Sequence, residues 1–519
     1  MSELSNDRSD KEERKRRASR PKVRTGCVTC KRRHKKCDEG QPSCLVCTRS
    51  GRTCEYRETL DHRTRAARET RTGGQTTNGY CYTGALTVTP PLLTGLANDM
   101  GPEERRYLDF FRTTTAVQCA GYFYDEFWQR LVHQVSEEQP AVCHAVISLG
   151  SLNYRFLQLR VGDSRRALDK AFPLQQSNKA IASLRRKLMT DPSGREGTEI
   201  ALVTCIILVS TMLFQEDAQW AGHHLRSGLK LLEEYRKDNP SQMGTSLAIT
   251  RAFDGVLLSW LTFSTPETRA EEAGGAQSFP FLVPRAFPEI TNDISKASEF
   301  VGSLALLVLH GHPQALAGTG DFDAVLRKLC GWRKQIKEST LIDQGHMSRR
   351  HRNALTLLEL WSGILYILIS VETQPLTGGE TRYDAFLAGF QQSVDLAREL
   401  LTTAEYPVPE PIPTFSVNMG IIAPLFWCGF KCRDWLVRQE ALILLRRWRR
   451  QEGIWSTDTT ARVLARVIEI ESAGLAPGDA IPEASRIESL RVDMPETGPS
   501  LCLRHRRRGQ ADWEAAWLA

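Results

Sequence analysis

The sequence predicts an all-α protein made of a small cysteine-rich module, a flexible linker and a large helical domain. Three observations lead to this prediction. Six cysteines lie within 28 residues near the N-terminus, residues 58–100 combine glycines, prolines and threonines without a helical period, and apolar residues then recur at three- and four-residue spacing. We expect a disordered basic tail over 1–24, the cysteine module over 25–57, the linker over 58–100, the helical domain over 101–475 and a C-terminal tail over 476–519.

The cysteines repeat the pattern C-x2-C-x6-C twice, with six residues between the copies. They are Cys27, Cys30, Cys37, Cys44, Cys47 and Cys54. A C-x-x-C pair lets two sulfurs point at one centre, about 2.3 Å from each, as a tetrahedral zinc site requires. Four cysteines fill one such site, and six cannot fill two separate sites unless two sulfurs bridge both metals. The spacing therefore favours a bridged pair of Zn2+ ions.

A disulfide framework is the main alternative for an even number of closely spaced cysteines. Residues 1–24 are charged throughout and contain no signal peptide. A thioredoxin-type redox pair would need a βαβ setting, which does not flank these cysteines. The other eight cysteines are scattered, mostly in apolar contexts, as is typical of free thiols in a reducing compartment. We therefore expect a zinc cluster in a soluble intracellular protein.

Positive charge is concentrated at the same end of the chain. Residues 1–72 contain 21 Lys and Arg against 11 Asp and Glu, whereas the rest of the chain contains 47 against 50. A polyanionic partner is therefore expected to bind the N-terminal end.

The two copies of the repeat carry this charge unequally. The first copy contains six side chains that are or can become cationic, namely Lys31, Arg32, Arg33, His34, Lys35 and Lys36. Two Zn2+ ions and six thiolates sum to a charge of about −2, and nearby cations can offset it. The second copy has the same thiolates but only two arginines at the matching positions. We therefore predict that the basic run forms a short helix that contacts double-stranded DNA in the major groove.

The segment resembles the fungal binuclear zinc-cluster DNA-binding domain of the Zn(II)2Cys6 type. The resemblance rests on the six cysteines, the basic run, Cys37-Asp38-Glu39 and Pro42. It implies a nuclear transcription factor of the RNA polymerase II type that reads CGG-like sites.

The resemblance also implies roles for individual residues. Cys27 and Cys44 would bridge the metals, Cys30 and Cys37 would complete one zinc site, and Cys47 and Cys54 the other. Arg33 and His34 would contact bases, and Lys31 and Lys36 would contact phosphates.

Two further segments bear on localisation and oligomeric state. A basic stretch in the tail is a candidate nuclear localisation signal, consisting of Arg14, Lys15, Arg16 and Arg17. Residues 55–72 lack the apolar a and d positions of a coiled coil. We therefore expect a monomer, or a homodimer formed through the helical domain.

Helical patterns follow one another from Pro102 onward, where Pro102-Glu103-Glu104 forms a typical first turn. We expect helices over 102–114, 124–135, 139–158, 174–189, 198–214, 219–236, 244–262, 293–309, 321–338, 348–371, 383–403, 418–430, 433–450 and 457–472. Residues 355–369 are apolar nearly all round and should be central. Convincing strand-type alternation is absent. The apolar run 200–214 is too short and too polar to predict a membrane span, so no membrane partner is expected.

A second likeness lies near the end of this region. Pro424-Leu425, KCRDWLVRQEALILL (431–445) and RRQEGIW (449–455) are similar to the fungus-specific transcription-factor domain, as are ERRYLDFF (104–111), Trp128 and PAVCHAVISLGSL (140–152). The likeness implies a regulatory domain, with the transcription machinery or a small-molecule effector as candidate partners. From helical periodicity we expect Ala441, Leu444 and Leu445 to point inward and Arg433, Arg438 and Glu440 to face solvent.

No short catalytic signature is present. The sequence has no G-x-G-x-x-G, P-loop, G-x-S-x-G or H-E-x-x-H motif. Cys428 and Cys432, four residues apart, fit buried thiols better than half of a metal site. We therefore predict that the protein is not an enzyme. The alternative is a helical ligand-binding or enzymatic domain for which the zinc cluster serves as a targeting or protein-contact module.

Overall fold

The computed structural model describes residues 27–38, 43–52, 54, 100–158, 170–190, 194–238, 245–261, 294–309, 322–342, 347–372, 376–402, 414–493 and 501–518. The chain divides into two compact units, Met1–Val88 and Thr89–Ala519. We call the first the cluster unit and the second the helical unit. The expected localisation signal at Arg14–Arg17 lies outside the described residues, and so does the expected linker over 58–100 apart from its last residue.

The described part of the cluster unit contains two short helices, α1 (Val28–Arg32) and α2 (Leu45–Arg49). Its buried apolar residues are all cysteines, with Val46 packed against them. The part of the unit that the structure describes therefore has almost no hydrocarbon core.

The N-terminal half of the helical unit is α4 (Pro102–Phe110), η1 (Phe111–Thr115), α5 (Ala116–Ala120), η2 (Phe127–Leu131), α6 (Val132–Glu138), α7 (Pro140–Leu157), α8 (Ala171–Thr190), α9 (Arg195–Phe214), α10 (Ala218–Asp238) and α11 (Thr245–Leu261). Pro102 occupies the first turn of α4, and the Glu104 carboxylate accepts a hydrogen bond from the Gly101 amide. This start agrees with the prediction from sequence. The five-residue segments η1 and η2 are π-helical turns.

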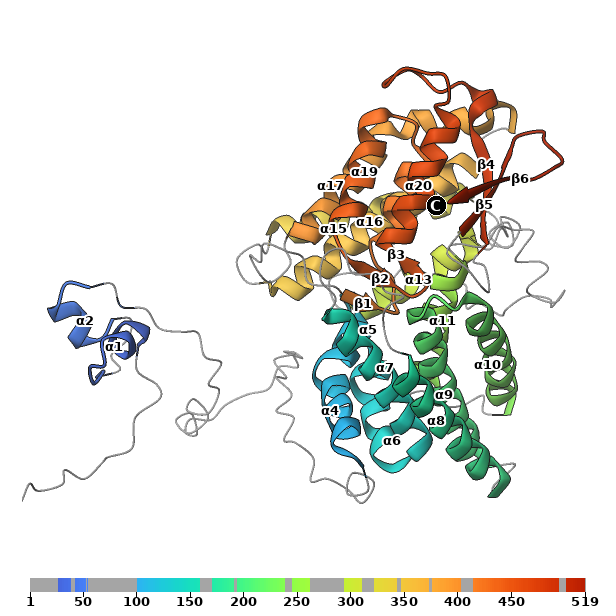
Figure 1. Cartoon of the computed structure of the whole chain (residues 1–519). Coiled ribbons are helices and arrows are strands. Elements are labelled where there is room, and N and C mark those ends of the chain that lie inside the picture. Colours follow the sequence, from blue (N-terminus) through green and yellow to red (C-terminus); the bar gives the residue numbers. More distant parts are fainter. Residues whose placement is uncertain are drawn as a thin grey trace, which may run out of the picture. The chain divides into compact units, whose positions relative to one another are not determined.

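The C-terminal half is α13 (Ile294–Leu309), α15 (Phe322–Ile342), α16 (Arg349–Glu372), η4 (Leu376–Phe386), α17 (Leu387–Thr402), α18 (Ile422–Lys431), α19 (Trp435–Arg447), α20 (Thr457–Glu471) and η5 (Glu483–Ser485). Figure 1 shows the two groups of helices meeting near the short strands β1 to β3. Every helix expected from periodicity is present, with small shifts at its ends.

Two helices form the centre of the helical unit. α9 and α16 are long and apolar enough to span a membrane by length and composition alone, but 78% and 94% of their most apolar windows are buried inside the unit. Their apolar surfaces are covered by other helices, as expected for residues 355–369.

The structure adds strands that the sequence pattern did not predict. β1 (Thr414–Ser416) pairs in parallel with β2 (Arg450–Glu452), and β2 pairs antiparallel with β3 (Trp455–Ser456). Strands of two or three residues are too short to show alternation.

A second sheet corrects the expectation of a C-terminal tail over 476–519. β4 (Ile487–Asp493), β5 (Leu501–Arg507) and β6 (Glu514–Leu518) form an antiparallel sheet in that order. β5 buries Leu501, Cys502, Leu503 and His505, whereas its three arginines are exposed or partly exposed. Because arginines dominate the composition of β5, its sequence shows no clear alternation of apolar and polar residues that would predict a strand.

The expectation that Arg433 and Arg438 face solvent is wrong. They are only 7% and 1% exposed. The Arg433 guanidinium donates to Glu380 at 2.9 Å and to Glu471 at 3.0 Å, and Arg438 also pairs with Glu471. The Lys431 ammonium donates to both carboxylate oxygens of Glu380 at 2.9 Å. Three buried cations thus share two buried carboxylates.

This network joins distant elements. Arg433 also donates to the carbonyl of Ile487 at 3.0 Å, and the Ile487 amide donates to Glu471 at 2.6 Å. The network therefore connects η4, the α18–α19 junction, α20 and β4. Ala441, Leu444 and Leu445 are buried as predicted, and Glu440 lies at the surface beside Arg398.

The second part of the motif, 449–455, is also structural. Glu452 accepts hydrogen bonds from the amides of Ile421 and Ile422 at 2.9 and 2.8 Å, at the N-terminus of α18. Gly453 has a φ of 56°, and a Cβ there would lie 1.7 Å from Ser259 Oγ. Only glycine fits that turn.

Candidate metal centre and nucleic-acid interface

Each copy of the cysteine repeat begins with a cysteine that caps a five-residue helix. The Cys27 sulfur accepts a hydrogen bond from the Cys30 amide at 3.3 Å, at the start of α1. The Cys44 sulfur accepts one from the Cys47 amide at 3.4 Å, at the start of α2. Because a cap and the third helical residue lie on the same side of the first turn, both sulfurs of each C-x-x-C pair face one centre.

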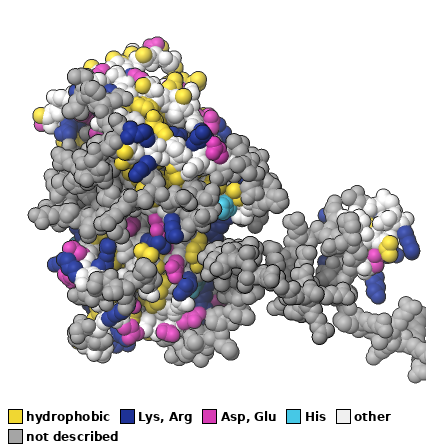
Figure 2. Space-filling model, turned by 180° about the vertical axis from the view of Figure 1, so that it is seen from behind, with side chains coloured by type: hydrophobic (Ala, Val, Ile, Leu, Met, Phe, Trp, Pro, Cys, Tyr) yellow, Lys and Arg dark blue, Asp and Glu magenta, His cyan; other side chains and the backbone are white. Residues whose placement is uncertain are grey.

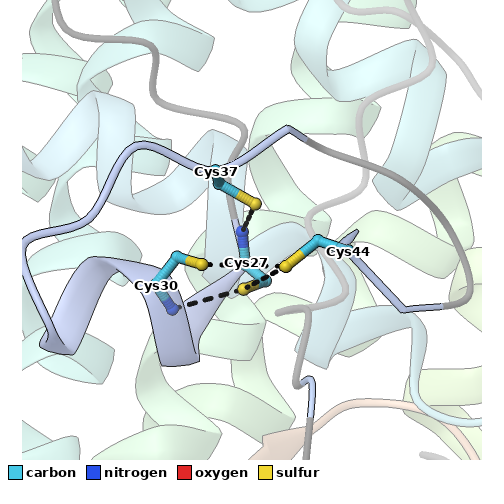
Figure 3. Close-up of side chains that lie close together, drawn as sticks. All are labelled: Cys27, Cys30, Cys37 and Cys44. Atoms are coloured by element: carbon cyan, nitrogen blue, oxygen red, sulfur yellow. Dashed lines mark hydrogen bonds between the residues drawn. The ribbon is translucent and has the colours of Figure 1, made fainter. Parts of the chain in front are cut away.

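The six sulfurs form two overlapping groups of four. One group is Cys27, Cys30, Cys37 and Cys44, the other is Cys27, Cys44, Cys47 and Cys54, and in each the ligand atoms lie within 4.8 Å of one another. Figure 3 shows the first group. The Cys27 and Cys44 sulfurs, common to both groups, are 3.7 Å apart. Metal–sulfur bonds of about 2.3 Å in a tetrahedron place sulfurs about 3.8 Å apart. The donor set therefore fits two zinc ions with two shared ligands.

The sulfur distances argue against the disulfide alternative. The Cys30 sulfur lies 3.7 Å from that of Cys44 and 3.9 Å from that of Cys47. A disulfide bond is about 2.0 Å long. All six cysteines are free thiols in this arrangement.

The two shared cysteines differ electrostatically from their neighbours. Burial raises the pKa of the Cys27 and Cys44 thiols, but the hydrogen bonds from the Cys30 and Cys47 amides outweigh it, so that both pKa values are lowered. Burial raises the pKa of the Cys30 thiol, and raises that of Cys47 to about 12. The capping amides therefore favour thiolates at the two positions common to both groups.

Asp38 links the two copies of the repeat. Its two carboxylate oxygens accept hydrogen bonds from the amides of Leu45 and Val46 at 2.9 and 3.2 Å. Together with Cys44, it satisfies the first three amides of α2. Sequence reasoning noted Asp38 only as part of a family pattern. Its capping role could not be predicted because it lies six residues before Cys44, the cap of α2.

We expect Asp38→Ala to loosen the second half of the cluster. Loss of a helix cap typically reduces stability by about 1 kcal/mol, which corresponds to about fivefold weaker zinc retention. Competition with a chromogenic chelator measures the effect on the full chain. Asp38→Asn keeps one acceptor oxygen, so its zinc retention should lie between that of the wild type and that of Asp38→Ala. Equal zinc retention in all three proteins would contradict the capping role.

The basic run is not the continuous helix that the sequence suggested. α1 ends at Arg32, Arg33 is its C-cap, and His34 has a φ of 52°. Gly51 has the same left-handed conformation, with a φ of 59°, after α2. The Lys35 amide then donates to the Cys30 carbonyl at 3.0 Å, which closes the helix end. The helix is short because its last carbonyls are used by this turn.

The turn changes the surroundings of the predicted DNA-contacting residues. Arg33 is partly buried and donates to Ser50 Oγ at 3.0 Å, whereas the other five members of the run are exposed. Lys and Arg side chains on the cluster unit are dark blue in Figure 2. The structure thus brings all six predicted zinc ligands together and presents the basic run along a helix and the following turn.

Comparison with known families supports the cluster. Residues 25–63 match the model of the fungal Zn(2)-Cys(6) binuclear cluster domain. No solved structure matches the chain.

One relative aligns over nearly the whole chain. The aspercryptin biosynthesis cluster-specific transcription regulator atnN of Emericella nidulans is 22% identical over 91% of both chains, which includes the helical unit. Other similarities are local. Transcriptional regulatory protein pro1 of Neurospora crassa is 54% identical over 37 residues, and the C6 finger domain transcription factor hasF of Aspergillus fumigatus is 51% identical over 37 residues. Each of these two alignments covers 7% of this chain and 5% of the relative.

Proposed function

We propose that this chain, a DNA-binding transcription regulator and not an enzyme, reads CGG-like sites in the major groove through residues 31–36, which lie within the match to the fungal Zn(2)-Cys(6) binuclear cluster domain. The observation that carries the proposal is the pair of overlapping sulfur groups beside an exposed basic run. Selection of bound sequences from random DNA with the full chain tests it. Enrichment of CGG-like sites is expected, and recovery of unrelated sequences would overturn it.

The cluster holds two zinc ions, and we assign six ligands to them. Cys27 and Cys44 would serve both ions, because their sulfurs belong to both groups and accept amide hydrogen bonds. Cys30 and Cys37 complete one site, and Cys47 and Cys54 complete the other. When bound, the zinc ions hold the two short helices together in a segment without an apolar core.

Within the basic run, Arg33 and His34 are the candidates for base contacts and Lys31 and Lys36 for phosphate contacts. Arg33 donates to Ser50 at 3.0 Å, so its guanidinium is already oriented by the second copy of the repeat. His34 adopts the left-handed conformation at the turn that follows the C-cap residue Arg33. A base-contacting side chain held by its surroundings loses less entropy on binding.

We expect Arg33→Ala to relax the preference for specific over random DNA by about ten- to hundredfold, since a bidentate guanine contact discriminates by roughly 1–3 kcal/mol.

Lys31→Ala should weaken binding to all sequences alike and lower the slope of log affinity against log salt by about one. Fluorescence-anisotropy titrations over a salt series measure both quantities.

The backbone turn decides how His34 is tested. Alanine at a φ of 52° would strain the turn, whereas glycine would not, so His34→Gly removes the imidazole alone. Lys334→Ala, on an exposed face of α15, serves as the control for loss of one positive charge. Equal losses on specific and random DNA for Arg33, His34 and Lys31 variants would contradict the assignment.

The remaining parts of the proposal concern localisation and regulation. A transcription regulator acts in the nucleus, and Arg14, Lys15, Arg16 and Arg17 are the candidate import signal. The helical unit is proposed as the regulatory part, which makes homodimer contacts or contacts with the transcription machinery. The alignment with the Emericella nidulans regulator extends over this unit, which is consistent with a role in the same kind of protein.

A further inference from the structure

The helical unit contains a cavity of about 470 Å³ between α11 and α13. These helices lie close to the short strands at the middle of the unit (Figure 1). The segment 123–127 and residues Asn418 and Met419 complete the wall. The volume falls within the roughly 300–1,000 Å³ of small-molecule sites.

Small residues of both helices line the cavity. Gly255 on α11 and Gly302 on α13 are part of the lining, together with several serines of α13. The apolar part of the wall includes Phe123, Phe127, Leu258, Phe300, Leu306 and Met419. A ligand with an apolar body therefore fits the larger part of the wall.

Two of the charged groups in the wall are satisfied by neighbours. Asp125 accepts hydrogen bonds from Asn418 Nδ2 at 2.7 Å and from the Trp128 amide at 3.1 Å. Glu299 accepts one from Arg251 Nη2 at 2.7 Å. Neither carboxylate needs a ligand.

Asp254 is different. It lies on α11 within the cavity wall, and among the described residues its carboxyl group makes no hydrogen bond or ion pair. Nearby, Arg251 Nε is buried and has no hydrogen-bond partner in the described part of the chain. The Asp254 carboxyl lies in a partly buried wall, where leaving it unpaired costs free energy, so it favours a ligand that donates a hydrogen bond to it.

The charges around Asp254 come from every element of the wall. They are Asp125 and Glu126 before η2, Arg236 on α10, Arg251 on α11, and Lys296 and Glu299 on α13. Burial raises the pKa of Asp254 to about 7, and Glu299 adds to this rise, while Arg236 and Arg251 oppose it. Desolvation, rather than a lack of nearby cations, therefore keeps the carboxyl partly protonated at neutral pH.

We propose that this cavity binds a small molecule with an apolar body and a basic amine, and that the amine pairs with Asp254. A carboxylate ligand is less well matched, because Arg251 is already paired with Glu299. The site lies within the helical unit, so the inference does not depend on how the cluster unit reads DNA.

Isothermal titration calorimetry of the full chain tests the proposal with three probes that share an indole body. Tryptamine carries an amine, tryptophol a hydroxyl group and indole-3-acetate a carboxylate. We expect tryptamine to bind about tenfold or more tightly than tryptophol, as is typical of a charge-assisted hydrogen bond. Indole-3-acetate should bind most weakly.

Two variants separate the amine contact from the cavity. Asp254→Asn should remove the advantage of tryptamine over tryptophol, and Asp109→Asn on the exposed face of α4 is the matched control. Gly302→Leu should abolish binding of all three probes by filling the cavity. The Gly302→Leu variant should retain the fold, because the only atom that a Cβ at position 302 would contact is Met419 Sδ, at 3.9 Å.

The same titration has a defined pH dependence. The amine can pair only with ionised Asp254, so with a pKa of about 7 for the free site the affinity should fall about tenfold from pH 8 to pH 6. Tryptophol should show no such change. Absence of tryptamine binding at millimolar concentration, tryptamine binding unaffected by both cavity variants, or tighter binding of indole-3-acetate would each overturn the proposal.

Discussion

Cys44→Ser is expected to unfold the cluster unit and abolish specific DNA binding. The Cys44 sulfur belongs to both groups of four, so its loss removes a ligand from each zinc ion. Among the described residues of the unit, the buried apolar side chains are themselves cysteines, so these residues supply no hydrocarbon core to hold the two helices. Structural zinc contributes about 10–16 kcal/mol in comparable small domains, and that contribution is folding free energy. Removal of zinc from the wild-type chain by a chelator should have the same effect.

Zinc content by atomic absorption and DNA binding by anisotropy measure this result. Cys330→Ser is the control, because Cys330 is an exposed thiol of α15 outside the cluster. Thermal unfolding of the helical unit should be unchanged in both variants. Specific DNA binding that survives complete zinc removal would overturn the role of the cluster.

Glu471→Gln should destabilise the helical unit by about 3–5 kcal/mol, the typical result of breaking a buried ion pair. The Glu471 side chain is fully buried and serves Arg433, Arg438 and the Ile487 amide at once. An amide in its place leaves the buried Arg438 without its carboxylate partner and leaves Arg433 with Glu380 alone, which Lys431 also uses. Chemical denaturation of the full chain, followed by tryptophan fluorescence, measures the change.

Glu440→Gln is the matched control on the neighbouring helix. Glu440 pairs with Arg398, and both side chains are more than a third exposed. Exposed pairs contribute about 0.2–1 kcal/mol. Equal destabilisation by the two substitutions would show that the buried network has no special role.

The same glutamate predicts a pH dependence. Burial raises the pKa of Glu471, but Arg433 and Arg438 outweigh it, so the folded-state pKa is below the ordinary value. A lowered carboxyl pKa adds stability that is fully present above about pH 4.5 and is lost as pH falls through the folded-state pKa. The stability difference between wild type and Glu471→Gln should therefore narrow below about pH 4.5.

Much of the fold followed from local sequence patterns. The helices of the helical unit begin and end close to their expected positions, because apolar periodicity and capping residues act within a few turns. The two sheets were not predicted. β1 to β3 are too short to show a period, and the arginines of β5 obscure the buried positions of Leu503 and His505.

The unequal charge of the two cysteine repeats predicts a basic surface on the first copy, and five of the six residues of the basic run are exposed. The backbone conformation of that run differs from the predicted helix. A run of six cationic residues suggested one helix, yet the left-handed turn at His34 ends it. The residue that matches His34 in the second copy of the repeat is Gly51, and glycine commonly occupies a left-handed position. The internal repeat therefore indicated a turn at His34, although the first copy has no glycine there. The hydrogen bond from Arg33 to Ser50 joins the two copies and was not readable from either alone.

The sequence by itself determined the metal centre, because all six ligands lie within 28 residues and their spacing sets the geometry of the sulfurs. Tertiary structure alone decided the fate of Arg433 and Arg438. Helical periodicity placed them at the surface, whereas their carboxylate partners Glu380 and Glu471 are separated from Arg433 by 53 and 38 residues. A charged side chain is buried only where the fold supplies its counter-charge, and no local pattern reveals a partner that distant.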